Sequence, residues 1–213
     1  MSMVYSETIK CPKCGHEKQV SVWRSLNGDI DPQAKQQLMD GSLFWHKCDG
    51  CGWQMDLFYP VLYHDMQNNA MVYCVAEQDI EEAKKVFASA EDMVEDKIPG
   101  YRNRVVSDHN ALREKAIIFD AGMDDRVIEL VKIVYASAAI KQGKAAKPEK
   151  AYYRKEGGKN FLEFVGEVPF GMEFDQTLYD RIAADFEKVF EKNNSFVINT
   201  QWAYDMLKEK GAR

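Results

Sequence analysis

The sequence predicts an α+β protein in two parts, and three observations support this class. Two short cysteine motifs lie in the first quarter of the 213 residues, among segments in which polar and apolar side chains alternate. Longer segments with apolar residues at helical spacing follow. Near the end, Gly157 and Gly158 separate two apolar segments, which is typical of a β-hairpin. We therefore expect antiparallel hairpins first, followed by a mixed helical and β-hairpin domain.

Composition limits the classes of function. The chain is 46% hydrophobic and 29% charged, which is sufficient for a buried core. Its net charge of −6 argues against a protein that wraps around duplex nucleic acid. It contains no run of eighteen apolar residues, and its start lacks the features of a signal peptide. We expect a cytoplasmic protein with no membrane partner, in a compartment that keeps cysteines reduced.

The clearest chemistry lies in two motifs of the form C-x-x-C-G, at residues 11–15 and 48–52. Such a loop directs both thiolates toward one ion, and the glycine after it lets the backbone turn back without a Cβ clash. Two loops together supply the four soft ligands of a tetrahedral metal site. The predicted ligands are Cys11, Cys14, Cys48 and Cys51.

The metal that fits this ligand set best is a structural Zn²⁺. Four thiolates fill a tetrahedral shell and leave no open position for water or substrate, which a catalytic zinc would need. Rubredoxin-like iron sites use the same two motifs, and S₄ geometry alone does not separate iron from zinc. Iron therefore stays open as the alternative cofactor.

The elements around these motifs predict a zinc ribbon over residues 1–77. Residues 18–24 alternate like a half-buried strand. Asp31 is expected to cap a helix that starts at Pro32, spans 34–39 and ends at 40–41. Further strands are expected at 43–47, 53–59 and 70–75. Antiparallel strands would thus be clamped at one end by the metal, with a helix inserted between the two motifs.

This part of the chain resembles the CpXC domain family. The resemblance rests on the Cys11-Pro12-Lys13-Cys14 start, the position of the second C-x-x-C motif and the strand pair after it. It extends over about residues 9–135 and includes the segment DDRVIEL at 124–130. It implies a bacterial or archaeal protein that binds zinc, in a family without an assigned activity. The four cysteines are the only functional residues that carry over.

Residues 78–213 predict a second, α+β domain. Helices are expected at about 79–96, 108–121 and 125–141, with a short extended piece at 102–106. The helix at 125–141 is apolar nearly all round, so we expect it to be central and buried. A hairpin is expected at 151–168, with a third strand at 196–198. Helices at 176–192 and 200–210 would be capped by Asp175 and Thr200.

Two histidines lie two residues from a cysteine of the motifs. On extended chain, positions i and i+2 share a face, so His16 and His46 could donate to the thiolates or replace a ligand. We favour the simpler interpretation that both are exposed at strand ends. Cys74 lies in an apolar run and is expected to be a small buried residue.

Three classes of function remain. We favour a zinc-stapled binding or scaffold module of unassigned activity that recognises another macromolecule, with protein as the partner. The alternative is a nucleic-acid-binding ribbon, since aromatics such as Trp45 and Trp53 could stack bases. Against it, residues 1–60 hold six Lys or Arg and seven Asp or Glu, whereas such a groove needs positive charge. The third class is an enzyme with its site in the C-terminal domain, although no known catalytic motif is present. There, Glu163 and Glu167 are expected to be solvated, and Asp108-His109 to be a chance pair.

Overall fold

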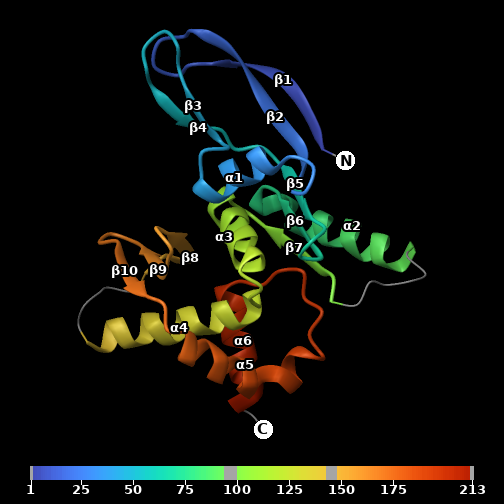
Figure 1. The fold of residues 1–213 in the computed structure, drawn as a ribbon, viewed down its shortest axis with the longest axis vertical. Helices are drawn as coiled ribbons and strands as arrows, with labels where there is room; N and C mark the ends of the chain where they lie inside the picture. Colours follow the sequence, from blue (N-terminus) through green and yellow to red (C-terminus); the bar gives the residue numbers. More distant parts are fainter. Residues whose placement is uncertain (1, 94–99, 143–147, 212–213) are drawn as a thin grey trace. The chain divides into compact units, whose positions relative to one another are not determined.

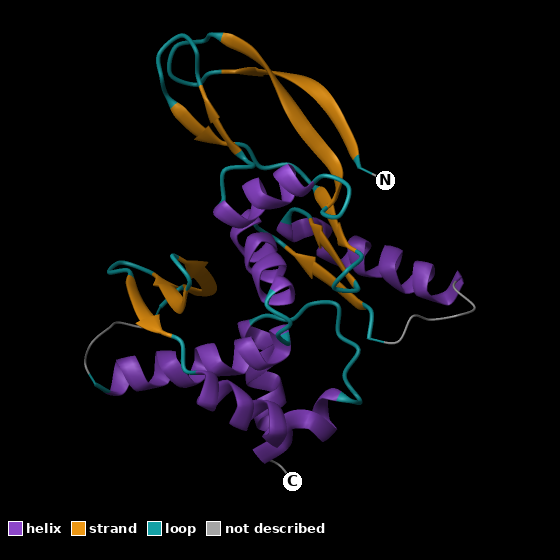
Figure 2. Cartoon of the chain, in the orientation of Figure 1, coloured by secondary structure: helices purple, strands orange, loops and turns teal. Residues whose placement is uncertain are grey.

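The computed structural model describes residues 2–93, 100–142 and 148–211. Contacts divide the chain into two compact units, Met1–Ala116 and Ile117–Arg213, which are described separately here. Each unit mixes helices and strands (Figure 1; Figure 2), so the predicted α+β class is confirmed. None of the helices in the described ranges is both long and apolar enough to cross a membrane.

Unit 1 is built on a five-stranded sheet with the order β1-β2-β5-β6-β7. Its strands are β1 (Met3–Lys10), β2 (Glu17–Asn27), β5 (Val61–Asp65), β6 (Ala70–Cys74) and β7 (Arg102–Val106). The pairs β1/β2 and β5/β6 are antiparallel, whereas β2/β5 and β6/β7 are parallel. Buried and half-buried residues alternate along β5 and β6, so the two strands form the centre of the core.

A small ribbon and three helices complete unit 1. Strands β3 (Trp45–Lys47) and β4 (Gln54–Asp56) pair antiparallel and carry the second cysteine motif between them. The helices are α1 (Pro32–Asp40), α2 (Ile80–Met93), preceded by a 3₁₀ turn η1 (Glu77–Asp79), and α3 (His109–Asp120). Helix α1 ends at Gly41, whose φ of 88° is left-handed, and Arg113 Nε donates to the Met39 carbonyl at 2.7 Å. This bond fastens the inserted helix to α3.

The structure differs from the sequence-based expectation for unit 1 in three places. Strands β1 and β5 were not predicted, and the strand expected over 53–59 is only β4, at 54–56. Asp31 occupies the N-cap of α1, but its side chain makes no capping bond. Residues 78–116 are grouped with unit 1 because β7 returns to pair with β6 and α2 contacts β7.

Unit 2 is organised around helix α4 (Asp125–Lys141), which contacts α5 (Gln176–Phe190) and α6 (Thr200–Gly211). Ten of its residues are buried, as expected for a central helix. Three of them are charged, namely Asp125, Glu129 and Lys132. Lys132 Nζ lies 2.8 Å from a Glu129 carboxylate oxygen, so these two charges form a buried pair. A three-stranded sheet, β10-β9-β8, completes the unit from β8 (Lys150–Glu156), β9 (Lys159–Val165) and β10 (Phe170–Glu173).

Two expectations for unit 2 are wrong. The third strand is β10, and residues 196–198 form no strand. Helix α6 is capped by Asn199 and not by Thr200, because the Asn199 side-chain oxygen accepts the Trp202 N–H at 2.9 Å. Asp175 caps α5 as expected and accepts the Thr177 N–H at 2.8 Å. The predicted end of the helix at 79–96 lies outside the described residues.

Candidate metal centre

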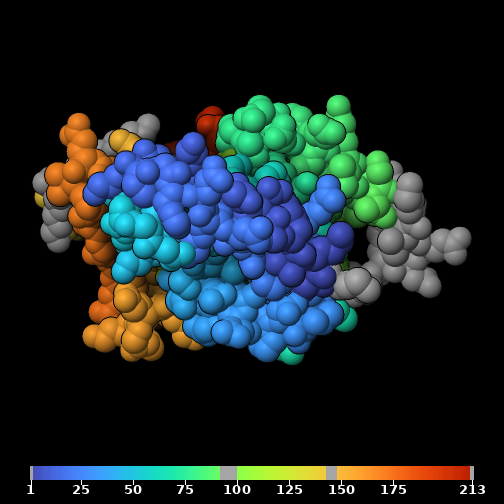
Figure 3. Space-filling view, turned by 90° about the horizontal axis from the view of Figure 1, so that it is seen from above, coloured from blue at the N-terminus to red at the C-terminus, as the bar shows by residue number. Residues whose placement is uncertain are grey.

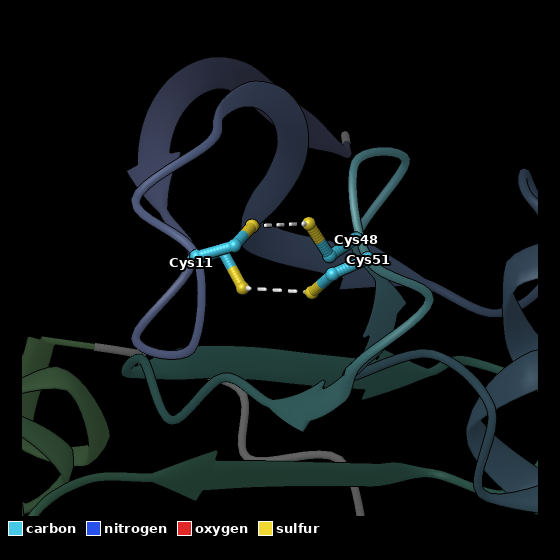
Figure 4. Close-up of side chains that lie close together, drawn as sticks. Cys11, Cys48 and Cys51 are labelled. Atoms are coloured by element: carbon cyan, nitrogen blue, oxygen red, sulfur yellow. Dashed lines mark hydrogen bonds between the residues drawn. The ribbon is translucent and has the colours of Figure 1, made fainter.

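The four cysteines of the two motifs meet at one point of unit 1 (Figure 4). Their sulfur atoms all lie within 4.8 Å of one another, and Cys11–Cys51 and Cys14–Cys48 are separated by 3.7 Å and 3.6 Å. A tetrahedron of thiolates with Zn–S bonds of about 2.3 Å has edges of roughly 3.8 Å. The sulfurs are therefore spaced to bind a single metal ion.

The two motifs adopt the same main-chain conformation. The Cys11 N–H donates to the carbonyl five residues later, and its own carbonyl accepts the Gly15 N–H, both at 2.9 Å. In the second motif the same bonds of Cys48 and Gly52 measure 2.8 Å and 2.9 Å. Both glycines have left-handed φ angles, 74° and 72°, which a residue with a Cβ rarely adopts. The glycine in each motif is thus required by the loop that aims the thiols.

Backbone N–H groups stabilise the thiolate form of the first cysteine in each motif. Burial raises the pKa of Cys11, but N–H groups of Cys14 and Lys13 donate to its sulfur and the net result is a pKa of about 7. For Cys48, burial likewise raises the pKa, and two N–H groups of its own loop lower it below the usual range. These N–H groups therefore favour the thiolate form that a metal ligand needs at both positions.

Cys14 has the opposite tendency. An N–H of His16 lowers the pKa of Cys14, but the neighbouring sulfurs and burial raise it to about 12. Four thiolates packed this closely repel one another unless a cation lies among them. Soft sulfur ligands together with this need for positive charge fit a divalent metal such as zinc.

Lysines on the first hairpin hold the second motif in place. Lys18 Nζ lies 2.9 Å from a carboxylate oxygen of Asp49 and donates to the Lys47 carbonyl at 3.1 Å. Lys13 Nζ lies 5.3 Å from the centre of the Trp53 ring. These contacts leave no pattern in the sequence, because the partners are about thirty or more positions apart along the chain.

The histidines near the motifs do not join the sulfur cluster, which contains only cysteines within the described part of the chain. His16 is exposed. Its side chain lies against Gly50, where an added Cβ would come within 3.1 Å of it. His46 is half-buried and not exposed as expected, and burial lowers the pKa of its imidazole. Cys74 is fully buried, as predicted, and burial raises the pKa of its thiol.

His109, which sequence analysis set aside as half of a chance pair, anchors the cysteine-bearing ribbon. Its ring stacks on Phe44 at a centroid distance of 3.4 Å and on Phe58 at 4.9 Å. Its Nε2 lies 3.3 Å from the Tyr59 carbonyl, and burial lowers its pKa. Asp108, the other half of the pair, caps α3 by accepting the Ala111 N–H at 2.7 Å. No local pattern links residue 109 to 44 and 58, so only the fold reveals this stack.

In unit 2, the two glutamates noted in the sequence have different surroundings. Glu163 accepts a hydrogen bond from Arg154 at 3.1 Å and is therefore paired. Glu167 lines an open hollow of about 340 Å³ together with Pro148, Glu149, Val165, Gly166, Val168 and Phe170. The two glutamates do not form one site.

Comparison with known proteins places unit 1 in a family. Neither a curated protein nor a solved structure matches the chain. The family model described as CpXC protein matches residues 9–132, which is more than half of the chain. The match includes both cysteine motifs, most of the five-stranded sheet and helices α1 to α3. The chain therefore belongs to the CpXC family.

Proposed function

We propose that the four cysteines hold one structural Zn²⁺ and that unit 1 is a zinc ribbon whose role is to bind another protein. The observation that carries the metal assignment is the meeting of four sulfurs, from two loops of the same main-chain conformation, within 4.8 Å. Four thiolates close the coordination shell, so the ion would stabilise the fold and would not offer an open position to a substrate. Sites of this kind contribute on the order of 10 kcal/mol to the folding of small zinc domains. The free cysteines fit a reducing compartment.

Metal content of the full chain tests this assignment. Inductively coupled plasma mass spectrometry of the purified protein should find one zinc per chain, and Cys14→Ser should lose it. Cys74→Ala is the matched control, because Cys74 is buried away from the cluster and should leave the stoichiometry unchanged. A red protein that contains iron would show that the metal is iron and not zinc. A protein isolated without metal would refute the proposal.

The surface of the ribbon supports a protein partner. Three large aromatic side chains around β3 and β4 are about half exposed: Trp45 by 55%, Trp53 by 46% and Phe58 by 49%. Aromatic residues are enriched at protein–protein interfaces. Several large apolar side chains exposed on one small ribbon are typical of an interaction surface. We therefore place the partner-binding surface on this ribbon.

Site-specific photo-crosslinking tests this surface. A photoreactive amino acid at Trp45 or Trp53 should give a discrete protein adduct in cells. Exposed Glu17, on strand β2, is the control position and should give none. Equal labelling at all three positions, or none at any, would refute the assignment.

Nucleic acid is the second candidate, because Lys13 lies over the exposed Trp53 ring and Lys47 is exposed in the same ribbon. Fluorescence anisotropy with single-stranded DNA and RNA tests it. Binding that weakens steeply with salt and is lost in Trp53→Ala would favour nucleic acid over protein. No binding at low salt would remove this candidate.

A further inference from the structure

The free edge of the five-stranded sheet is a long and unprotected strand. Strand β1 ends the strand order, and seven of its eight residues are exposed, including the apolar Met3, Val4 and Tyr5. Figure 3 shows the dark blue atoms of this N-terminal strand on the surface of unit 1. Edge strands of stable monomers usually carry proline, many charges or a bulge. β1 has no proline, and its only charged residues are Glu7 and Lys10.

The irregularity that does occur lies on the inner strand. Register between β1 and β2 shifts between Met3 and Val4, whose partners are Ser25 and Trp23, so the additional residue is Arg24 of β2. The outer edge of β1 is therefore regular along its length. A regular edge presents alternate N–H and C=O groups to any strand that lies beside it.

The hairpin of β1 and β2 also has little sheet to support it. Within the described strands, β2 pairs with β5 only through Ser25, Leu26 and Asn27. Among the strands that the structure describes, residues 17–24 of β2 pair with β1 alone. A two-stranded hairpin is marginally stable in water, whereas additional strands stabilise it. This hairpin would gain stability from a strand on its outer side.

Symmetry then selects the register for a second copy. Two antiparallel strands of one sheet are related by a twofold axis perpendicular to the sheet, so residues of the same parity face one another. An axis at Ser6 places Glu7 opposite Tyr5, Met3 opposite Ile9 and Val4 opposite Thr8. An axis at Glu7 would place two carboxylates directly opposite each other, which is destabilising. The strand is thus complementary to itself when Ser6 lies on the axis.

We propose that β1 is a self-association edge, on which β1 of a second copy pairs antiparallel with Ser6 facing Ser6. The two hairpins then form a four-stranded antiparallel sheet across the dimer. Backbone hydrogen bonds along β1 provide the affinity, and the apolar pair Met3–Ile9 and the β-branched pair Val4–Thr8 set the register. The interface lies on unit 1 and requires no residue of the sulfur cluster.

Cysteine crosslinking of the full chain tests the register. Directly opposed residues in an antiparallel pair have Cα atoms about 4.5–5.5 Å apart, within the range of a disulfide. Ser6→Cys should therefore give a covalent dimer with oxidised glutathione. Thr8→Cys should not, because the two copies of residue 8 would lie about 13 Å apart along the strands. Ser21→Cys is the matched control, since Ser21 is the exposed partner of Ser6 on the inner strand.

The oligomeric state in solution provides the second test. Light scattering should find a dimer for the parent chain and for Ser21→Lys, whereas Ser6→Lys places two ammonium groups on the axis and should give a monomer. Circular dichroism would establish that both variants remain folded. A monomeric parent, a Ser6→Lys variant that stays dimeric, or crosslinking of Thr8→Cys as efficient as that of Ser6→Cys would each overturn the proposal.

Discussion

Replacing His109 by alanine should loosen the cysteine-bearing ribbon without touching a metal ligand. The substitution removes two stacked ring contacts, with Phe44 and Phe58, worth about 1 kcal/mol each. It also removes the hydrogen bond between His109 and the Tyr59 carbonyl, worth roughly 0.5–1 kcal/mol at this length. Because the ring is 9% exposed, a cavity replaces it. We expect the free energy of unfolding of unit 1 to fall by about 3 kcal/mol.

The measurement has to report on unit 1 alone, since two compact units can unfold separately. A urea titration read by hydrogen-exchange mass spectrometry follows the segments 44–59 and 109–116 independently of the rest. His16→Ala is the control, because His16 is exposed and its loss should change stability by less than about 0.5 kcal/mol. A loss below about 1 kcal/mol in His109→Ala, or equal losses in both variants, would contradict the anchoring role of the stack.

Three further predictions concern His109, the cysteine Cys48 and the two histidines near the motifs. Burial lowers the folded-state pKa of His109, so the unfolded chain takes up the proton first as the pH falls. The contribution of His109 to the free energy of unfolding should therefore be complete above about pH 6.5 and decrease below it. In the same titration, His109→Ala should lose less stability in acid than the parent. Cys48→Ser should lose the metal and make the ribbon protease-sensitive, while a fragment beginning near residue 117 survives limited proteolysis; a fully resistant variant would argue against a stapling metal. Changing His16 and His46 together to alanine should leave zinc stoichiometry unchanged by mass spectrometry, because neither imidazole joins the sulfur cluster; metal loss would identify one of them as a ligand.

Sequence reasoning succeeded where the signal is local. The two motifs and most helices depend on spacing within a few residues, and Asp175 caps α5 as its pattern predicts. Strand β1 was missed because almost all its residues are exposed, so no alternation of buried and exposed positions marks it in the sequence. The pairing of β7 with β6 spans a long connection, so local sequence patterns leave no trace of it.

For the candidate site, the meeting of the four cysteines could be predicted, whereas the contacts that support it could not. Cysteine spacing alone identifies Cys11, Cys14, Cys48 and Cys51 as neighbours, since few other arrangements use two such loops. The hydrogen bonds that Lys18 donates to the second motif depend on where two hairpins come together. They are set by the tertiary fold, which a single sequence read by pattern does not specify.

The parallel pairing of β2 with β5 has a consequence for how the chain folds. Residues 28–60 must leave one strand and return beside it before any β2–β5 hydrogen bond can form, and such non-local pairing is slow. A metal held between Cys14 and Cys48 joins the turn that precedes β2 to the second half of that connection. Closing a loop of this length removes about 4 kcal/mol of chain entropy from the unfolded ensemble. The ion should therefore accelerate folding of unit 1 more than it slows unfolding, so that metal supply sets the rate at which the newly made chain reaches its native sheet.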